Sequence, residues 1–180
     1  MAKAKAKFLD FEIDKLTNSI ENAVTGELFE TDVSRIYSKD LKLIKSGEWS
    51  FDWRKEVAEK DRQVYKLTTI QNPKIVHGLI SLTDKGDHIF MDLIESAKFN
   101  KGRNKQYLGV AGNLVAFGCK MSFELSYDGV VSFIAKTQLI EHYQKSLGAK
   151  LFRNNRMFID TRESLLLVMK YFKGFRYGKF

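Results

Sequence analysis

The stretch that decides the fold is residues 89–113, which read IFMDLIESAKFNKGRNKQYLGVAGN. It begins with an apolar run, Ile89–Ser96, that has the length and composition of a buried strand. Four cations then fall within residues 98–105, and glycines punctuate the next segment, Gln106–Asn113, which opens a helix. The sequence therefore predicts a strand, a basic loop and a helix in succession.

The start of this helix is a candidate phosphate site. The first N–H groups of a helix have no partner within the helix, and the helix dipole adds positive potential there. Gly109, Ala111 and Gly112 place no large side chain in the way of a ligand, and the preceding cations raise the potential further. The structural alternative is that these small residues only let the helix pack closely on a sheet.

The residues before this unit predict strands and short helices. Residues 16–36 are expected to be extended, with a break at Thr25–Gly26, and residues 38–45 and 53–60 to be helical. Turn residues then separate three apolar runs, which favours an antiparallel meander. Those three runs are residues 63–70, 75–82 and 88–96.

The residues after it predict alternating helices and strands. Val110, Leu114, Phe117 and Met121 share one helical face. Residues 130–135 and 151–159 are expected to be strands, and residues 137–147 a helix. The order implies a mixed α/β sheet with a locally parallel strand pair. A last helix is predicted with Thr161 as its N-cap and with Leu165, Val168, Met169 and Phe172 facing inward.

Composition limits the class of protein. The 180 residues predict one domain, 1–180, with a hydrophobic fraction of 44% that is ordinary for a globular protein. Cys119 is the only cysteine, which excludes a disulfide framework or a cysteine metal cluster within the chain. No apolar stretch is long enough to span a bilayer, and acidic residues interrupt the N-terminus before any signal-like core. A cytoplasmic location is expected.

The net charge of +8 suggests an anionic partner. Residues 98–180 carry fifteen basic and five acidic side chains, whereas residues 1–97 carry fifteen and seventeen. Residues 1–7 and 173–180 are expected to be flexible basic tails. Nucleic acid bound through these tails is therefore one possible partner.

Two motifs resemble a known family. Gln106-x-x-Gly109-x-Ala111 resembles the acyl-CoA signature of the GCN5-related N-acetyltransferases (GNAT), which stands between the family's fourth strand and third helix. Val131–Ala135 and the helix that ends at Leu147-Gly148-Ala149 resemble its fifth strand and the following helix end. The resemblance covers residues 63–160 well and the first sixty residues weakly.

The resemblance implies a mixed, mostly antiparallel sheet flanked by helices, with a cofactor cleft where the fourth and fifth strands splay apart. It also implies direct transfer of an acetyl group from acetyl-CoA to an amine, without a metal. Lys136 stands where the family often has an asparagine that contacts the cofactor. The cofactor-binding residues implied in this way are Leu93, Ile94, Gln106, Tyr107, Leu108, Gly109, Val110, Ala111, Gly112, Asn113 and Lys136.

Two catalytic residues are implied, each with a structural alternative. Tyr143 matches the tyrosine that protonates the departing CoA thiolate, but it also shares a helical face with Leu139 and Leu147. Glu95, at the end of the fourth strand, could accept the proton of the acceptor ammonium or could instead pair with the basic loop. Asp92 is a weaker candidate base.

Three alternatives for function remain open from the sequence. The chain could be an acetyltransferase for a small molecule or peptide, a basic scaffold that binds nucleic acid or an acidic protein, or an acetyltransferase acting on an RNA-borne amine such as aminoacyl-tRNA. His77, His88 and His142 lack metal-ligand spacing. The acceptor is not identified, and either a monomer or a homodimer is compatible with the sequence.

Overall fold

The computed structural model describes residues 8–16 and 19–178. Its main feature is a seven-stranded sheet in the order β3-β4-β5-β6-β8-β10-β9, in which only the β6–β8 pair is parallel. A small second sheet has the order β2-β1-β7. The strands are β1 (Ile20–Asn22), β2 (Leu28–Phe29), β3 (Thr31–Arg35), β4 (Gln63–Thr69), β5 (Gly78–Asp84), β6 (Ile89–Ser96), β7 (Tyr107–Leu108), β8 (Val131–Ile134), β9 (Lys150–Arg153) and β10 (Arg156–Ile159).

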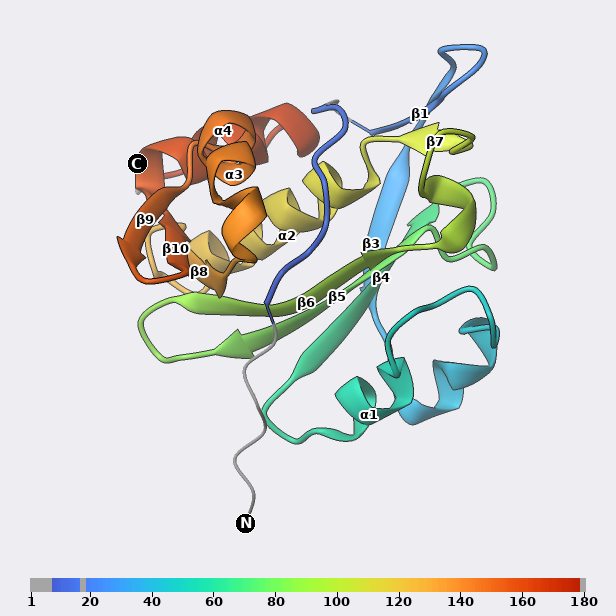
Figure 1. The fold of residues 1–180 in the computed structure, drawn as a ribbon, viewed down its shortest axis with the longest axis horizontal. Coiled ribbons are helices and arrows are strands. Elements are labelled where there is room, and N and C mark those ends of the chain that lie inside the picture. The colour runs from blue at the N-terminus through green and yellow to red at the C-terminus, as the bar shows by residue number, and fades with distance from the viewer. Residues whose placement is uncertain (1–7, 17–18, 179–180) are drawn as a thin grey trace.

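Helices lie on both faces of the main sheet (Figure 1). Helices α2 and α4 pack against each other above β5 and β6, and α1 lies on the opposite face. No helix of the described residues is long and apolar enough to cross a membrane. The helices are α1 (Trp53–Ala58), α2 (Val110–Glu124), α3 (Ile140–Leu147) and α4 (Thr161–Tyr171), with short 3-10 helices at Ser38–Leu43, Lys98–Asn100 and Thr137–Leu139.

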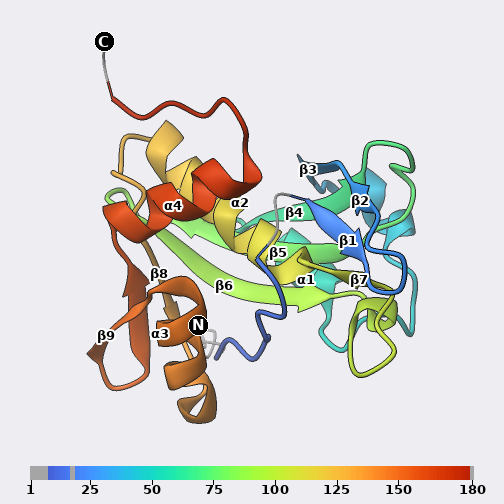
Figure 2. The same ribbon diagram turned by 90° about the horizontal axis from the view of Figure 1, so that it is seen from above.

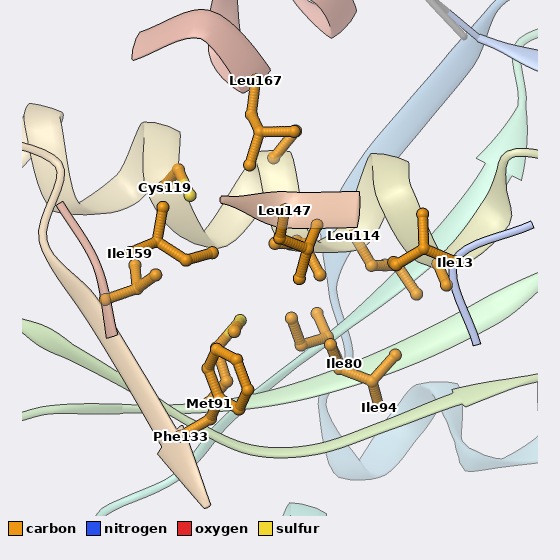
Figure 3. Close-up of a cluster of buried hydrophobic side chains, with 14 of the residues drawn as sticks. Ile13, Ile80, Met91, Ile94, Leu114, Cys119, Phe133, Leu147, Ile159 and Leu167 are labelled. Atoms are coloured by element: carbon orange, nitrogen blue, oxygen red, sulfur yellow. The ribbon is translucent and has the colours of Figure 1, made fainter. Parts of the chain in front are cut away.

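Each face of the sheet has its own apolar core. The smaller core contains Trp53 of α1, which is 1% exposed, with Leu79 and Leu93 of the sheet. The larger core lies under α2 and α4, and it includes residues from the N-terminal segment. Figure 3 shows Ile13 of that segment beside Ile94 and Leu114 in this core. The first described residues are therefore part of the folded domain.

The parallel strands β6 and β8 separate soon after they meet. They pair only at Ile89↔Val131 and Phe90↔Ser132, at the start of β6. The remaining three quarters of β6 pairs only with β5, on its other edge. The antiparallel meander and the mixed sheet that the sequence predicted are thus confirmed, as is the splayed strand pair that the resemblance implied.

Some boundaries differ from the prediction. Residues 151–159 are not one strand but most of a hairpin formed by β9 and β10. Asn154, between the two strands, adopts a left-handed conformation (φ 53°) that suits a tight turn. Strand β5 begins at Gly78 rather than at Ile75, whose side chain is 44% exposed. The predicted tail from residue 173 packs on the domain as far as it is described, with the ring of Tyr177 4.7 Å from that of Phe123.

The inward face of α4 is also rotated relative to the prediction. Met169 is 58% exposed, whereas Leu167, Val168 and Tyr171 are buried. Three consecutive leucines, 165–167, allow more than one apolar helical face, and the close approach of Tyr171 to Gly112 of α2 selects this one. Asp160, rather than Thr161, caps the helix by accepting the N–H of Glu163.

Candidate functional site

The gap between the splayed strands is bordered by an extended N-terminal segment, residues 8–14, here called the strap. The N–H of Leu9 donates to the carbonyl of Ile134 at 2.6 Å, and the N–H of Lys136 donates to the carbonyl of Leu9 at 3.1 Å. The strap therefore extends the sheet beside β8. Figures 1 and 2 show it in dark blue, running past α3 toward the start of α2.

Alternation along the strap explains its position. Leu9, Phe11 and Ile13 are buried in the larger core, and the residues between them are acidic. An apolar–polar alternation with period two is typical of a strand with one face against a core. This pattern was visible in the sequence and was the signal that could have placed the segment.

A cavity of about 470 Å³ lies between the strap and the free part of β6. Leu93, Ile94 and Glu95 line it from β6, and Ala111 lines it from α2. The strap contributes Phe8, Asp10, Phe11, Glu12 and Asp14 to its wall.

Tyr143 lies behind Phe11, which lines the cavity, and is fully buried. Its hydroxyl donates a hydrogen bond of 2.6 Å to the carbonyl oxygen of Phe11, and its ring packs 5.1 Å from the ring of Phe11 and 5.4 Å from that of Phe133. Burial raises the pKa of the Tyr143 phenol above its ordinary value, so the proton stays on the oxygen at neutral pH.

His142 also binds the strap, which the sequence did not indicate. Its Nε2 accepts the backbone N–H of Ile13 at 2.9 Å. His142 and Tyr143 are neighbours in α3, so one turn of this helix holds both Phe11 and Ile13. Adjacent residues of a helix project about 100° apart, so spacing alone does not bring these two side chains to one segment.

Glu95 is 2% exposed and accepts hydrogen bonds from a ring of donors. The donors are the N–H of Ser50 at 2.5 Å, the N–H of Phe51 at 3.3 Å, the indole of Trp53 at 2.7 Å and the ammonium of Lys101 at 2.8 Å. Burial alone raises the pKa of this carboxyl, but the hydrogen bonds from Lys101, Ser50 and Trp53 outweigh burial and hold it below its ordinary value.

Asp92 does not line this cavity. Its carboxylate accepts the hydroxyl of Thr83 at 2.6 Å and lies 3.6 Å from the guanidinium of Arg62. Burial raises the pKa of Asp92, against the lowering effect of Thr83 and Arg62.

The start of α2 forms the other end of the cleft. Gly109 caps the helix in a left-handed conformation (φ 90°), which residues with a Cβ rarely adopt. The N–H of Gly109 donates to Oδ1 of Asp14 at 3.1 Å, and the ammonium of Lys105 lies 3.1 Å from Oδ2. A carboxylate of the chain itself thus occupies the predicted anion site.

The residues predicted to bind the cofactor do not all face this cavity. Gln106 and Tyr107 line a second cavity of about 390 Å³, where the Tyr107 ring packs 4.8 Å from the ring of His77. Asn113 is buried and donates to the hydroxyl of Thr31 at 2.8 Å. Leu108 belongs to β7, Val110 is buried in the larger core, and Lys136 pairs with Asp10 of the strap.

Gly112 has a packing role. A Cβ placed on it would overlap the hydroxyl of Tyr171 and would lie 2.9 Å from Cδ2 of Leu16. The absence of a side chain there serves contact with α4 and with the segment that follows the strap.

Known structures share this arrangement of sheet and helices. The structure of AtaTR bound with AcCoA is 16% identical over 77% of this chain and 98% of that chain, with a TM-score of 0.55. A spermidine N-acetyltransferase SpeG chimera from Vibrio cholerae and hSSAT is 15% identical over 76% of this chain and 98% of that chain, with a TM-score of 0.50. This is the GNAT fold.

A further structure with the GNAT fold, the KacTA–DNA complex, is 12% identical over 77% of this chain and 98% of that chain, with a TM-score of 0.50. No family model and no curated protein matches the sequence. At these identities the likeness establishes the fold, and in this GNAT fold β6 and β8 are the fourth and fifth strands that the resemblance had implied.

Other reactive groups in the described part of the chain lie outside the site. Cys119 is fully buried in α2, and burial raises the pKa of its thiol to about 12, which leaves it protonated and unreactive. Among residues 8–16 and 19–178, no group of three or more His, Cys, Asp or Glu side chains could hold a metal ion.

Proposed function

We propose that the protein is an N-acetyltransferase that moves an acetyl group from acetyl-CoA to an amine by direct transfer. The observation that carries this proposal is the pair of polar groups at the two ends of one cleft. The Gly109 helix start binds an anion at one end, and at the other end the Tyr143 hydroxyl lies behind Phe11 of the strap, to whose carbonyl it donates. Between them lies the free edge of β6, which can pair with an extended ligand.

The residues at the helix start fit the phosphates of coenzyme A. The carboxylate of Asp14 already binds there, which shows that the N–H of Gly109 and the ammonium of Lys105 can hold an anion. Ala111 offers little steric obstruction beside them. These are the residues that would hold the pyrophosphate.

When bound, acetyl-CoA supplies a thioester that an amine can attack. The N–H groups of β6 near Ile94 and Glu95 would orient and polarise its carbonyl group, and Tyr143 would hold a proton at its hydroxyl for the departing sulfur. Leu93 and Ile94 present the backbone beside which the pantetheine arm would lie.

We assign Glu95 a positioning role on the acceptor side rather than the role of base. Four donors surround its carboxylate, and its lowered pKa makes it a weak proton acceptor. By binding Ser50 and Trp53 it fixes the loop that leads into α1 against the end of β6. The ammonium proton of the acceptor would then leave to water.

The distribution of charge favours an enzyme over a nucleic-acid scaffold. Several cations of the basic half are already paired with carboxylates, including Lys101 with Glu95 and Lys105 with Asp14. Lys145 and Lys150 pair with Glu141 and Asp160 in the same way. Their positive charge is partly neutralised within the domain, so it contributes less to a continuous surface for phosphates.

Calorimetric titration with acetyl-CoA, and with CoA as competitor, tests the proposal. We expect saturable binding of both and acetyl transfer to at least one member of a panel of polyamines, amino acids, peptides and aminoacyl-tRNA. The same titration on an Asp14→Asn variant, which removes the carboxylate from the helix start but keeps the apolar residues of the strap, completes the test. An absence of binding at millimolar acetyl-CoA in both proteins would refute the proposed function.

A further inference from the structure

We propose that the strap, residues 8–14, is an intramolecular competitor of acetyl-CoA that must leave the cleft before the cofactor can bind. The inference rests on the proposed function, because it concerns access to the same cleft. It assigns a regulatory role to the segment of the chain that borders this cleft.

The first reason is that Asp14 occupies the anion site. Its carboxylate accepts the N–H of Gly109 and pairs with Lys105, and its side chain is only 18% exposed. A phosphate group would need the same donors. The two anions therefore cannot both be bound at the start of α2.

The second reason is that the strap covers the proposed acid. The carbonyl of Phe11 accepts the hydroxyl proton of Tyr143, and Phe11 packs on the tyrosine ring. This contact leaves Tyr143 with no exposed surface. A hydroxyl held in this way cannot reach a sulfur atom in the cleft until Phe11 moves.

The third reason is that the strap joins both ends of the cleft in one extended chain. It pairs with β8 through Leu9, binds α3 through Phe11 and Ile13, and reaches α2 through Asp14. Displacement at one end loosens the other, because only two residues separate Phe11 from Asp14. An anion that displaces Asp14 would thus also favour release of Tyr143.

The strap is held by contacts that can be broken without unfolding the sheet. The strap forms only an isolated bridge, between Leu9 and Ala135, on one edge of the β8 segment. The hydrogen bonds between β8 and β10 on the other edge would remain if the strap left. Its two ion pairs, Asp10 with Lys136 and Asp14 with Lys105, are partly exposed and are therefore weakened by salt. Burial of Leu9, Phe11 and Ile13 supplies most of the free energy that holds the strap on the domain.

Asp14→Asn tests the competition directly. The amide oxygen can still accept the N–H of Gly109, but the negative charge at the helix start is lost. We expect the dissociation constant for acetyl-CoA to fall about three- to tenfold, the range expected for one charge at a helix terminus with a paired lysine. Glu59→Gln, an exposed carboxylate beside α1, is the matched control and should leave the constant unchanged.

A reversible lock provides the opposite test. Leu9 and Ala135 are bridge partners, so Leu9→Cys/Ala135→Cys can form a disulfide that pins the strap to β8. Desulfo-CoA serves as the probe because it has no thiol to exchange. We expect its binding to weaken at least tenfold in the oxidised protein and to recover on reduction, whereas Leu9→Cys alone should not respond to oxidant.

Hydrogen exchange on the unmodified protein covers the case in which the cysteine variant does not fold. The amides of Leu9 and Ile13 are bonded to Ile134 and His142, so they should be protected without ligand and lose protection with acetyl-CoA. Unchanged or increased protection at saturating acetyl-CoA would overturn the strap proposal alone. Absence of binding to both wild type and Asp14→Asn would overturn the proposed function with it.

Discussion

The hydroxyl of Tyr143 donates a 2.6 Å hydrogen bond to the carbonyl oxygen of Phe11, which lies 132 positions earlier in the chain. This bond joins the helix that would supply the catalytic proton to the strap that borders the cleft. The structural and catalytic interpretations of Tyr143 are therefore compatible: the same hydroxyl has a structural partner when the strap is bound and can face a ligand when the strap has left.

Tyr143→Phe separates these two roles. The variant keeps the ring that packs on Phe11 and Phe133 and loses only the hydroxyl. We expect acetyl transfer to fall by roughly two to four orders of magnitude and the unfolding free energy to fall by about 1 kcal/mol. Affinity for acetyl-CoA should not weaken, since the strap has lost one contact. Turnover equal to wild type would restrict Tyr143 to a structural role.

Glu95→Gln should destabilise the fold. Its carboxylate lies among the donors of Ser50, Trp53 and Lys101, and an amide cannot accept from all of them. Chemical denaturation at pH 7 should show a loss of about 2 to 4 kcal/mol. Glu59→Gln should show none, and equal stability of the two variants would contradict the role assigned to Glu95.

The pH dependence of Glu95 gives a second measurement. Its folded pKa lies below the ordinary value of about 4.5, so the ionised form stabilises the folded state. This stabilisation is complete above about pH 4.5 and is lost as the pH falls through the folded pKa. The difference in stability between wild type and Glu95→Gln should therefore shrink in acid, and a constant difference would argue against an ionised Glu95.

Protonation of His77 should make the unfolding free energy depend on pH in a range above that of Glu95. Burial lowers the pKa of its imidazole from 6.5 to about 4, so the unfolded chain binds the proton first as the pH falls. The unfolding free energy should drop by up to about 3 kcal/mol between pH 6.5 and pH 4. His77→Gln should remove this part of the pH dependence. If the unfolding free energy of the variant falls with pH as steeply as that of wild type, a group other than His77 causes the pH dependence.

Two glycines of α2 form a matched pair. Gly112→Ala places a methyl group against Leu16 and the hydroxyl of Tyr171, and we expect a loss of about 1 to 3 kcal/mol in stability. Gly118→Ala meets Leu82 and Met91 at 3.6 Å, an ordinary contact, and should gain about 0.5 to 1 kcal/mol from helix propensity. Thermal unfolding of both variants and of wild type is the measurement. A Gly112→Ala variant more stable than Gly118→Ala would refute the packing argument.

Local patterns predicted the fold well. The meander of β4, β5 and β6 follows from short apolar runs between turn residues, and α2 follows from apolar spacing after Gly109. The parallel contact of β6 with β8 follows from the strand–helix–strand order. Each of these inferences needs residues that are close in sequence.

The candidate site was predicted only in part, because its key contacts are distant in sequence. Nothing near Asp14 indicates that its carboxylate meets Gly109, 95 positions later. His142 likewise binds Ile13 across 129 positions. Sequence patterns located the helix start and Tyr143, but they could not show that one segment of the same chain contacts both.

The strap also imposes an order on biosynthesis. Residues 8–14 leave the ribosome before their partners in β8 and α3, which follow β6 and α2 in the chain. Three apolar side chains of the strap therefore lack their final contacts while most of the protein is translated. Docking of the strap is a late, non-local event in folding, so the cleft would stay open during synthesis and close only when this segment meets β8 and α3.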